Sequence, residues 1–450
     1  MKRIAIIADN SLEFVSRLLK SWNNDEVAVL IDYRTPCSAC LEMIIRADVS
    51  EVYTDRRDLF DYLEQNEGNR FKVELMGIDN GVTEISNEVR NLYIKRYDDK
   101  EAIILFSSGT TGNCKGVRLS HSAITMNAER IAERKRIITS SSLYIYKTFS
   151  HCASFIGELV VGLVSGAHVY ICSTKSLIRM HLENIGKYAI THISVNPSVI
   201  QMIIKNTKKH YYFSDLKLVS CSGALLSKQC LEEAQNYFGC DIVNMYGMTE
   251  VASLFSCQYC KSINTKKTVE FESVGFPLVG NTFRIWNNEL NCEAKAGEIG
   301  EIHISSATLM LGYLGEVGPN LDGEDYWHTG DMGFASADGE LYIVGRKDRM
   351  IISCGHNIFP EYIERIVKNS GYVEECIVTG VKDDVYGEKI LCIYIGKSGR
   401  ENIEEQLRKI CIEQLAQYEV PHSFRECERF AYTSSGKICV NVQDMEAGRE

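Results

Sequence analysis

Long apolar runs are missing from this sequence of 450 residues. No uninterrupted stretch approaches the ~20 apolar residues that a membrane-spanning helix needs, so we predict no membrane span. The N-terminus, from Met1 to Ile7, leads into a short strand and lacks the pattern of a signal peptide. We therefore expect a cytoplasmic protein.

An excess of basic residues is also missing. The chain carries 49 Lys and Arg residues against 60 Asp and Glu residues, which gives a formal net charge of -11. This balance disfavours nonspecific binding of nucleic acid, although a local basic patch could still hold an anionic cofactor. A chain of this length is expected to fold into two or more domains, and its 45% apolar residues are typical of a globular protein.

Cysteine is abundant, with 17 residues, but the signals that accompany a disulfide framework are absent. Without a secretion signal, we interpret these residues as reduced thiols. Two Cys-x-x-Cys pairs, Cys37/Cys40 and Cys257/Cys260, could in principle share a zinc ion. They lie far apart in the chain and neither belongs to a Cys-rich ribbon, so free thiols are the simpler interpretation.

The most specific stretch runs from Leu105 to Val117 and reads LFSSGTTGNCKGV, directly after the apolar, strand-like run 102–106. Its polar donors and glycines are Ser107, Ser108, Gly109, Thr110, Thr111, Gly112, Lys115 and Gly116. Glycines let the backbone approach a ligand closely, while amides, hydroxyls and an ammonium bind phosphate oxygens. The spacing differs from that of the Walker loop. We predict a different loop for the phosphates of ATP, with a Gly/Ser/Thr surface turn as the alternative.

This loop resembles the signature loop of the adenylate-forming superfamily, which contains acyl-CoA synthetases, adenylation domains of peptide synthetases, and luciferases. The family form is S/T-S-G-T-T-G-x-P-K-G, and only its proline differs here, where Cys114 stands. Blocks similar to the family's follow in family order from about Lys2 to Val440. A further block that usually precedes this region in the family is absent.

The resemblance implies an α/β fold with two domains. Residues 1–347 would form a large N-terminal domain of parallel-sheet α/β subdomains plus a small β subdomain, and residues 348–450 a small mobile C-terminal α+β domain. Independently, strand and helix patterns alternate from Lys2 to Asp55, which favours a parallel sheet covered by helices. We also expect a helix from His121 with Ser120 as its N-cap.

Further local patterns predict elements along the rest of the chain. We expect a strand over 168–172 and another that begins near Thr191 and ends at a turn containing Pro197. A hairpin turn is predicted over 337–340, where the sequence reads ADGE. In the last hundred residues, the expected elements are a helix over 360–368, strands over 375–381 and 390–395, and a helix over 403–415.

The segment from Asn244 to Glu250, NMYGMTE, resembles the family's nucleotide-binding turn. The resemblance implies that Asn244 lies in the site, that the Tyr246 ring stacks on adenine, and that Gly247 lets the chain pass close. Thr249 would offer its hydroxyl to the α-phosphate, and Glu250 would supply a hard oxygen ligand for Mg²⁺.

Five further residues are implied to serve the nucleotide or the domain junction. The backbone at Gly223 and Ala224 would border the adenine, Asp331 would accept both ribose hydroxyls, and Arg346 would reach the ribose or phosphate as a fixed cation. Asp348 matches the family's hinge.

The hairpin around Gly355 would border the tunnel for the thiol. The run that contains it resembles aryl- and acyl-CoA ligases more than peptide-synthetase modules, which usually carry a lysine where Ile352 stands.

Two residues are implied to serve the reacting acid. Lys437, in a Ser-Gly-Lys motif, would lie between the carboxylate and the α-phosphate and stabilise the charge that develops on transfer. His151 occupies the place of a family histidine that lies against the carboxylate substrate, although a lone histidine is more often structural. No acid occurs between Thr148 and Gly157, which favours a substrate without an α-amino group.

The implied reaction is the ATP-dependent activation of a small carboxylic acid, with release of pyrophosphate, followed by transfer to a thiol. CoA is the expected acceptor, and Mg²⁺ and ATP are the expected cofactors. A stand-alone adenylation enzyme that loads the acid, or an amino acid, onto a carrier-protein phosphopantetheine is the rival. A non-catalytic nucleotide-binding relative is the alternative of another class. The sequence does not identify the acid or the oligomeric state.

Overall fold

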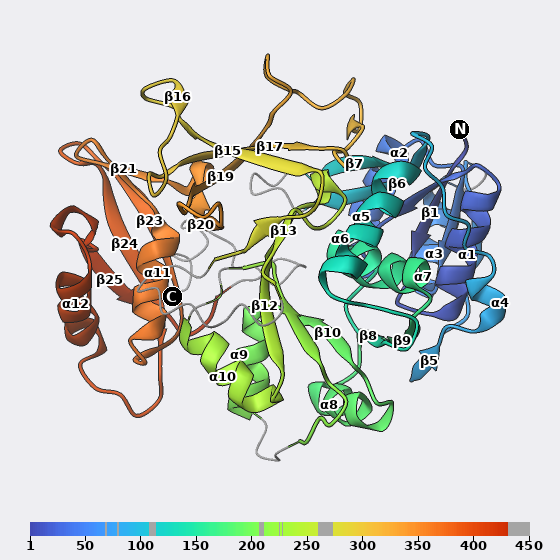
Figure 1. Cartoon of the computed structure of the whole chain (residues 1–450), viewed down its shortest axis with the longest axis horizontal. Helices are drawn as coiled ribbons and strands as arrows, with labels where there is room; N and C mark the ends of the chain where they lie inside the picture. Colours follow the sequence, from blue (N-terminus) through green and yellow to red (C-terminus); the bar gives the residue numbers. More distant parts are fainter. Residues whose placement is uncertain are drawn as a thin grey trace. The chain divides into compact units, whose positions relative to one another are not determined.

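The computed structural model of the chain describes residues 1–67, 70–78, 81–107, 114–206, 211–224, 226, 228–259 and 273–430 (Figure 1). The chain divides into two compact units. The first contains Met1–Phe283 and Ile304–Trp327, and the second contains Arg284–His303 and the chain from His328 onward. This division follows compactness rather than chain order, so the domain boundary expected between residues 347 and 348 stays a prediction. Among the described helices, none combines the length and the apolar character needed to span a membrane.

A seven-stranded sheet contains most of the N-terminal strands of the first unit, in the order β18-β7-β6-β2-β1-β3-β4. Its strands are β1 (Arg3–Ile7), β2 (Val27–Leu30), β3 (Glu51–Thr54), β4 (Lys72–Leu75), β6 (Glu101–Ser107), β7 (Lys115–Ser120) and β18 (Gly312–Tyr313). All of them are parallel except β7 and β18, which pair antiparallel with their neighbours. Helices α1 (Leu12–Asn23), α2 (Cys37–Arg46) and α3 (Arg57–Glu67) connect the parallel strands. The predicted alternation of strand and helix is confirmed here.

An eight-stranded sheet forms the other half of the first unit, in the order β14-β13-β12-β11-β10-β8-β9-β5. Its strands are β5 (Val82–Glu84), β8 (Ser142–Ile145), β9 (His168–Cys172), β10 (His192–Val195), β11 (Leu218–Cys221), β12 (Asp241–Tyr246), β13 (Ser256–Cys257) and β14 (Phe276–Pro277). The five strands from β9 through β8, β10 and β11 to β12 run parallel. The strand predicted over 168–172 is confirmed as β9.

Helices connect and cover the strands of this second sheet. They are α4 (Asn87–Arg90), α5 (His121–Arg134), α6 (Cys152–Ser154), a π-helix η1 (Phe155–Val160), α7 (Val161–Ser165), α8 (Ile178–Lys187), α9 (Pro197–Asn206) and α10 (Lys228–Phe238). The predicted N-cap of α5 is confirmed, because the Ser120 Oγ accepts a hydrogen bond from the Ala123 N–H at 3.1 Å. The predicted turn at Pro197 is wrong: Pro197 begins α9, since proline fits the first turn of a helix, where its missing N–H costs nothing.

The second unit holds most of a five-stranded sheet in the order β16-β15-β17-β19-β20. Its strands are β15 (Asn281–Asn287), β16 (Cys292–Glu293), β17 (Gly300–Ser306), β19 (Trp327–Ala335) and β20 (Leu341–Arg346). The hairpin predicted over 337–340 is confirmed, because β19 and β20 pair antiparallel across it and Gly339 has a φ of +85°. The left-handed backbone at this position favours glycine.

A second five-stranded sheet completes this unit, in the order β22-β21-β24-β23 with β25 beside β24. Its elements are β21 (Ile351–Ser353), β22 (His356–Ile358), α11 (Pro360–Asn369), β23 (Val373–Asp383), β24 (Gly387–Gly396), α12 (Ile403–Gln414) and β25 (Ser423–Glu426). Figure 1 shows α11 beside β23. Apolar side chains of the helices and strands form one buried core here. The helices and strands predicted for this region are confirmed.

Candidate functional site

Four parallel strands of the eight-stranded sheet end at one edge, which we call the carboxyl edge. β8 ends before Tyr146 and Lys147, β10 before Asn196, β11 before Ser222, and β12 before Gly247. In open α/β sheets, ligands bind outside the carboxyl ends of the strands. The carboxyl edge is therefore the candidate site of the first unit.

The turn after β12 can accept only glycine. A Cβ atom on Gly247 would lie 1.8 Å from the carbonyl oxygen of Ser253 and 2.8 Å from the Cα atom of Leu254. The chain folds back tightly on itself here and places Thr249 and Glu250 on the short 3-10 helix η2 (Thr249–Val251). Backbone packing thus fixes the position of both residues.

Glu250 and the phosphate-loop residue Lys115 meet through a tyrosine. The Tyr313 hydroxyl donates a hydrogen bond to Glu250 Oε1 at 3.0 Å, and the Lys115 Nζ lies 4.5 Å from the centroid of the Tyr313 ring. Lys115 is on β7 and Tyr313 on β18, and these strands are adjacent. A cation-π contact and a charge-assisted hydrogen bond hold both charged groups in place. The ammonium expected at the phosphates and the carboxylate expected at Mg²⁺ are therefore brought together.

His151 and Cys152 form a corner beside Thr249. The Thr249 hydroxyl donates to the Cys152 Sγ at 3.5 Å, and burial raises the pKa of this thiol to about 11, so that it stays neutral. The His151 Nε2 lies 3.8 Å from Asp32 Oδ2. Burial opposes the ionisation of Asp32, but hydrogen bonds from Arg34 outweigh it and lower the pKa of this carboxyl. His151 thus faces the carboxylate of Asp32. Its neighbour Cys152 contacts Thr249, the predicted α-phosphate ligand.

Asn244 and Tyr246 precede this turn on β12. Asn244 is buried, its Nδ2 donates to the Ser273 carbonyl at 3.1 Å, and its Oδ1 accepts from the Met245 N–H. The Tyr246 ring packs edge-on against Phe255, with ring centroids 6.3 Å apart. Contacts within the chain therefore hold both side chains, and their nucleotide contacts stay predictions.

Gly223 and Ala224 follow β11 and are exposed at the carboxyl edge. Gly223 has a φ of +90°, and a Cβ there would lie 3.7 Å from the side chain of Asn196. The open, left-handed turn matches the predicted backbone border of the adenine. No contact with a nucleotide tests it.

In the second unit, three predicted residues form one ion network. The Arg346 Nη1 lies 2.9 Å from Asp331 Oδ1 and donates to the Thr329 carbonyl at 3.2 Å, and its Nε lies 3.3 Å from Asp348 Oδ1. Asp331 and Arg346 are directly opposite in the β19/β20 pairing. Burial opposes the charge of Arg346, but Asp331 and Asp348 outweigh it and raise the pKa of the guanidinium. The predicted ribose acid and its arginine partner are therefore positioned together, beside the predicted hinge residue.

Gly355 lies in the turn between β21 and β22, which pair antiparallel. It has a φ of +79°, and the preceding Cys354 has a φ of +49°. The glycine hairpin expected from the sequence is thus present, and its role at a thiol tunnel stays a prediction.

Several predicted residues lie outside the described part of the chain. They are Ser108, Gly109, Thr110, Thr111 and Gly112 of the phosphate loop, together with Lys437. Ser107 ends β6, and its side chain is also outside the described set.

Comparison with known families now adds to the geometry. The profile of the AMP-binding enzyme family matches residues 1–314, and that of the AMP-binding enzyme C-terminal domain matches residues 362–437. The chain belongs to the AMP-binding enzyme family. The resemblance noted in the sequence is therefore confirmed.

Two relatives in this AMP-binding family illustrate the similarity in sequence. One is the mitochondrial medium-chain acyl-CoA ligase ACSF2 of Macaca fascicularis, 29% identical over 350 residues, which cover 74% of this chain and 55% of the relative. Another is the oxalate-CoA ligase of Arabidopsis thaliana, 27% identical over 347 residues, which cover 76% of this chain and 66% of the relative. The matched region spans 55% of the first ligase and 66% of the second, so the chain covers between about half and two thirds of their length.

Solved structures share the AMP-binding fold over almost the whole chain. The ATP-bound RpMatB-BxBclM chimera B1 gives a TM-score of 0.85 at 21% identity, covering 99% of this chain and 88% of the other. The o-succinylbenzoate CoA synthetase MenE of Bacillus subtilis, in complex with the OSB-AMP intermediate, gives a TM-score of 0.83 at 21% identity, covering 98% and 88%. The predicted fold class is confirmed.

One group in the second unit has the composition of a metal site. Glu301, His303 and His328 each place a ligand atom within 4.8 Å of the others. However, the two imidazole rings stack in parallel, with centroids 3.7 Å apart and 7° between their planes. The nitrogen lone pairs lie in the ring planes, so stacked rings cannot both direct one at the same ion. The Lys347 Nζ also lies 2.5 Å from Glu301 Oε2, so a cation already neutralises the carboxylate. This group does not fit a metal ion.

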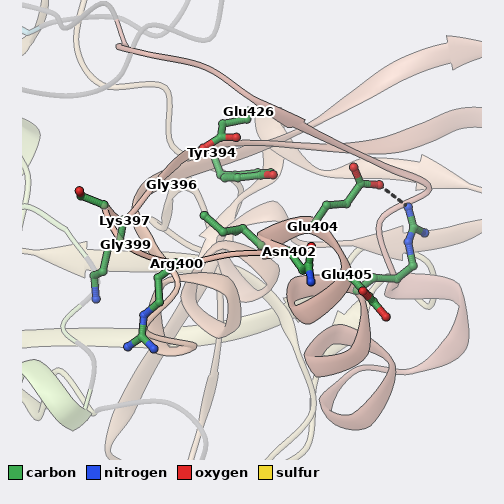
Figure 2. Close-up of a pocket in the computed structure, with 12 residues that line it drawn as sticks. Tyr394, Gly396, Lys397, Gly399, Arg400, Asn402, Glu404, Glu405 and Glu426 are labelled. Atoms are coloured by element: carbon green, nitrogen blue, oxygen red, sulfur yellow. Dashed lines mark hydrogen bonds and ion pairs between the residues drawn. The ribbon is translucent and has the colours of Figure 1, made fainter.

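A groove of about 760 Å³ also lies in the second unit, at the start of α12 (Figure 2). Its charges are mixed: Lys397, Arg400 and Arg408 lie among Glu404 and Glu426, and Glu404 pairs with Arg408 at 3.2 Å. None of the residues predicted for the AMP-binding site lines it. The mixed charge favours neither an anion nor a cation.

A buried charged pair at the carboxyl edge was missed in the sequence. Lys147 follows β8, Glu158 lies on the π-helix η1, and the Lys147 Nζ is 3.3 Å from Glu158 Oε2. The two residues flank the stretch 148–157, which lacks acids. One signal in the sequence could have indicated this pair: Lys147 and Glu158 are single charged residues within otherwise apolar runs.

Proposed function

We propose that this protein uses ATP to activate a carboxylic acid as an acyl-adenylate, with release of pyrophosphate, and then transfers the acyl group to a thiol. The observation that carries the proposal is that Tyr313 contacts both residues: Lys115 lies against its ring, and its hydroxyl donates a hydrogen bond to Glu250. A lysine for phosphates and a carboxylate for a metal ion, held side by side, suit a nucleoside triphosphate. Membership of the AMP-binding family supports the same chemistry.

In the first half-reaction, a carboxylate oxygen of the acid attacks the α-phosphorus in line, and pyrophosphate leaves. We assign the Thr249 hydroxyl to donate to an α-phosphate oxygen and Lys115 to the outer phosphates. The donor set fits Mg²⁺, because Glu250 offers a hard carboxylate oxygen, and a bound Mg²⁺ would supply positive charge to the phosphates. Lys437 is assigned to the charge that develops between the acid and the α-phosphate.

In the second half-reaction, the thiol attacks the carbonyl of the mixed anhydride and AMP leaves. We assign Asp331 and Arg346 to the ribose, Asp348 to the hinge of the C-terminal domain, and the Gly355 hairpin to the path of the thiol. CoA is the first candidate acceptor, since the two relatives described above are named as CoA ligases. A carrier-protein phosphopantetheine is the competing acceptor, and a cytoplasmic location remains a prediction.

The experiment is acid-dependent release of pyrophosphate from ATP and Mg²⁺, measured across fatty, aryl and amino acids. Thioester formation is then compared with free CoA and with a phosphopantetheinylated carrier protein. Release with at least one acid supports the proposal, and the better acceptor identifies the second substrate. No release with any acid would favour a non-catalytic nucleotide-binding protein.

Lys437→Ala separates the two half-reactions. We expect adenylate formation to fall by about 100-fold or more, because the developing charge loses its cation, while thioester formation from a preformed acyl-adenylate stays within a few-fold of wild type. Pyrophosphate release and single-turnover thioester formation measure the two steps. The control is Lys382→Ala, which removes an exposed lysine of the second unit. Equal losses in both steps would contradict the role assigned to Lys437.

A further inference from the structure

A buried polar cluster lies at the carboxyl edge, next to the His151 corner. Its members are Tyr146 and Lys147 after β8, Ser194 on β10, and Glu158 on η1. The Lys147 Nζ donates to the Ser194 Oγ at 2.9 Å and lies 3.3 Å from Glu158 Oε2. The cluster therefore joins two strand ends to the helix that follows His151.

The cluster is charged although it is largely shielded from solvent. The side chains of Lys147 and Glu158 are 17% and 6% exposed. Burial raises the pKa of Glu158 and of Tyr146, and the charge of Glu158 raises that of the Tyr146 hydroxyl further. Removing two charges from water costs several kcal/mol per ion, which their attraction offsets only if hydrogen bonds complete the pair.

The hydrogen bonds of the cluster are incomplete. Within the described part of the chain, neither Glu158 Oε2 nor the Tyr146 hydroxyl has a hydrogen-bond partner, and both atoms are buried. The contact of Glu158 with Lys147 is ionic but lacks hydrogen-bond geometry. Buried polar atoms without partners are rare in native proteins, and each calls for a ligand, a water or a functional reason.

The surrounding structure favours a ligand over a purely structural brace. Single π-turns within helices occur frequently at functional sites, and Glu158 lies on one. His151 and Cys152, next to the predicted α-phosphate ligand Thr249, belong to the helical segment just before it. An acid bound with its carboxylate near Thr249 would extend its tail along this segment.

The chemistry of the open positions defines the tail. Glu158 faces two cations, because the buried Lys135 as well as Lys147 favours its charged form. The unpaired polar atoms, and not a net charge of zero, therefore define the tail. Glu158 Oε2 can accept a hydrogen bond, and the Tyr146 hydroxyl can donate or accept one. A neutral hydroxyl group satisfies both atoms, whereas a methyl group satisfies neither.

We propose that Tyr146, Lys147 and Glu158 form the inner end of the acid pocket and select acids that carry a hydroxyl group on the tail over plain alkanoic acids of equal length. This inference rests on the proposed function. It assigns specificity to residues outside the nucleotide-binding segments, and Ser194 holds Lys147 in position.

The test compares kcat/KM for hydroxyalkanoic acids and for alkanoic acids of the same chain length, measured by pyrophosphate release. We expect the wild type to prefer the hydroxy acid by at least about tenfold at one chain length, because a site built for a hydroxyl leaves its polar atoms unpaired with the analogue. Tyr146→Phe should lower this ratio by about tenfold. The double variant Lys147→Met/Glu158→Leu, which removes both members of the ion pair together, should reverse the preference.

The matched control is Tyr144→Phe. Tyr144 lies two residues before Tyr146 and its ring stacks on the ring of Tyr146 at 6.2 Å, but its hydroxyl is hydrogen-bonded to His181 Nδ1 and to Asn184 Nδ2. This control should leave the ratio unchanged, while KM for ATP stays within a few-fold of wild type in every variant.

The outcomes separate this inference from the proposed function. A wild-type ratio near or below one at every chain length overturns the inference alone. So does a ratio that neither Tyr146→Phe nor the double variant changes, which is the result expected of a structural brace. No release with any acid overturns the proposed function and this inference with it.

Discussion

Each unit of the molecule contains a partly buried ionic group, and the two groups are held by different numbers of hydrogen bonds. In the second unit, Arg349 pairs with Glu361 at 3.0 Å and with Glu364 at 2.7 Å, and donates to the Val378 carbonyl at 3.2 Å. In the first unit, Lys147 pairs with Glu158 at 3.3 Å without hydrogen-bond geometry.

The difference follows from the chemistry of the two cations. Arginine has five N–H donors in a planar fork and can serve several acceptors, whereas lysine is a compact point charge. The arginine group ties α11 to β23 and acts as a structural brace. The lysine group leaves two buried polar atoms open at the carboxyl edge, Glu158 Oε2 and the Tyr146 hydroxyl, whereas the arginine group leaves one, Glu361 Oε2. The two open atoms side by side are the arrangement on which the inferred hydroxyl site depends.

The largest expected effect comes from removing the cation of the arginine group. Arg349→Met leaves Glu361 and Glu364 buried without their counter-charge, so the free energy of unfolding should fall by about 3–5 kcal/mol. Denaturation with urea, followed by circular dichroism, measures the loss. Arg349→Lys keeps the charge but not the fork and should lose less. A loss below about 1 kcal/mol for Arg349→Met would mean that the group is no stronger than a surface ion pair.

Loss of the Glu250 carboxylate should reduce activity and leave stability almost unchanged. Glu250→Gln should lower the rate of pyrophosphate release by about 100-fold, because the metal-binding charge is lost, while the free energy of unfolding changes by less than about 1 kcal/mol. Steady-state kinetics and urea denaturation measure the two quantities.

Tyr313→Phe is the matched control for Glu250. It keeps the ring under Lys115 and removes only the hydroxyl that donates to Glu250, so the loss of rate should be about tenfold or less. If Glu250→Gln kept its full activity, the metal-binding role assigned to Glu250 would be wrong, and the proposed function would lose its main support.

A further expected effect concerns the pH dependence of stability. Burial raises the pKa of Glu361 to about 7, with Arg349 opposing the shift and Glu364 adding to it. The pKa of this carboxyl is 4.5 in the unfolded state, so the folded state binds the proton more tightly. The free energy of unfolding therefore falls as the pH rises from about 4.5 to about 7.

The variant Glu361→Gln replaces the titrating carboxyl with an amide that does not ionise. Compared with wild type, its free energy of unfolding should be similar at pH 4.5 and higher at pH 8, by on the order of 2 kcal/mol. Urea denaturation across this pH range measures the difference. Parallel curves for the two proteins would show that Glu361 is not a source of the pH dependence.

Local signals were sufficient to predict most of the fold. Caps such as Ser120, alternating apolar strands such as β9, and the hairpin turn before β20 depend on residues close in sequence. Pro197 was misjudged because a proline ends a strand and begins a helix with equal ease.

The site was predicted only in part, since its remaining contacts join distant segments. The sequence does not single out Tyr313, because nothing local shows that β18 pairs with β7 and that the Tyr313 hydroxyl reaches Glu250. Lys147 and Glu158 likewise become a pair only when the helix after His151 packs on the strand ends.

The π-turn from Phe155 to Val160 has one more consequence. Its wider loop holds one residue more than an α-turn, and each residue advances an α-helix by about 100°, so the segments on either side are out of phase by that angle. The segment that begins at His151 can thus contact Thr249, the predicted α-phosphate ligand, while α7 packs on α5. Deleting the single residue Gly157 would restore a regular helix and turn one of these segments away from its neighbours.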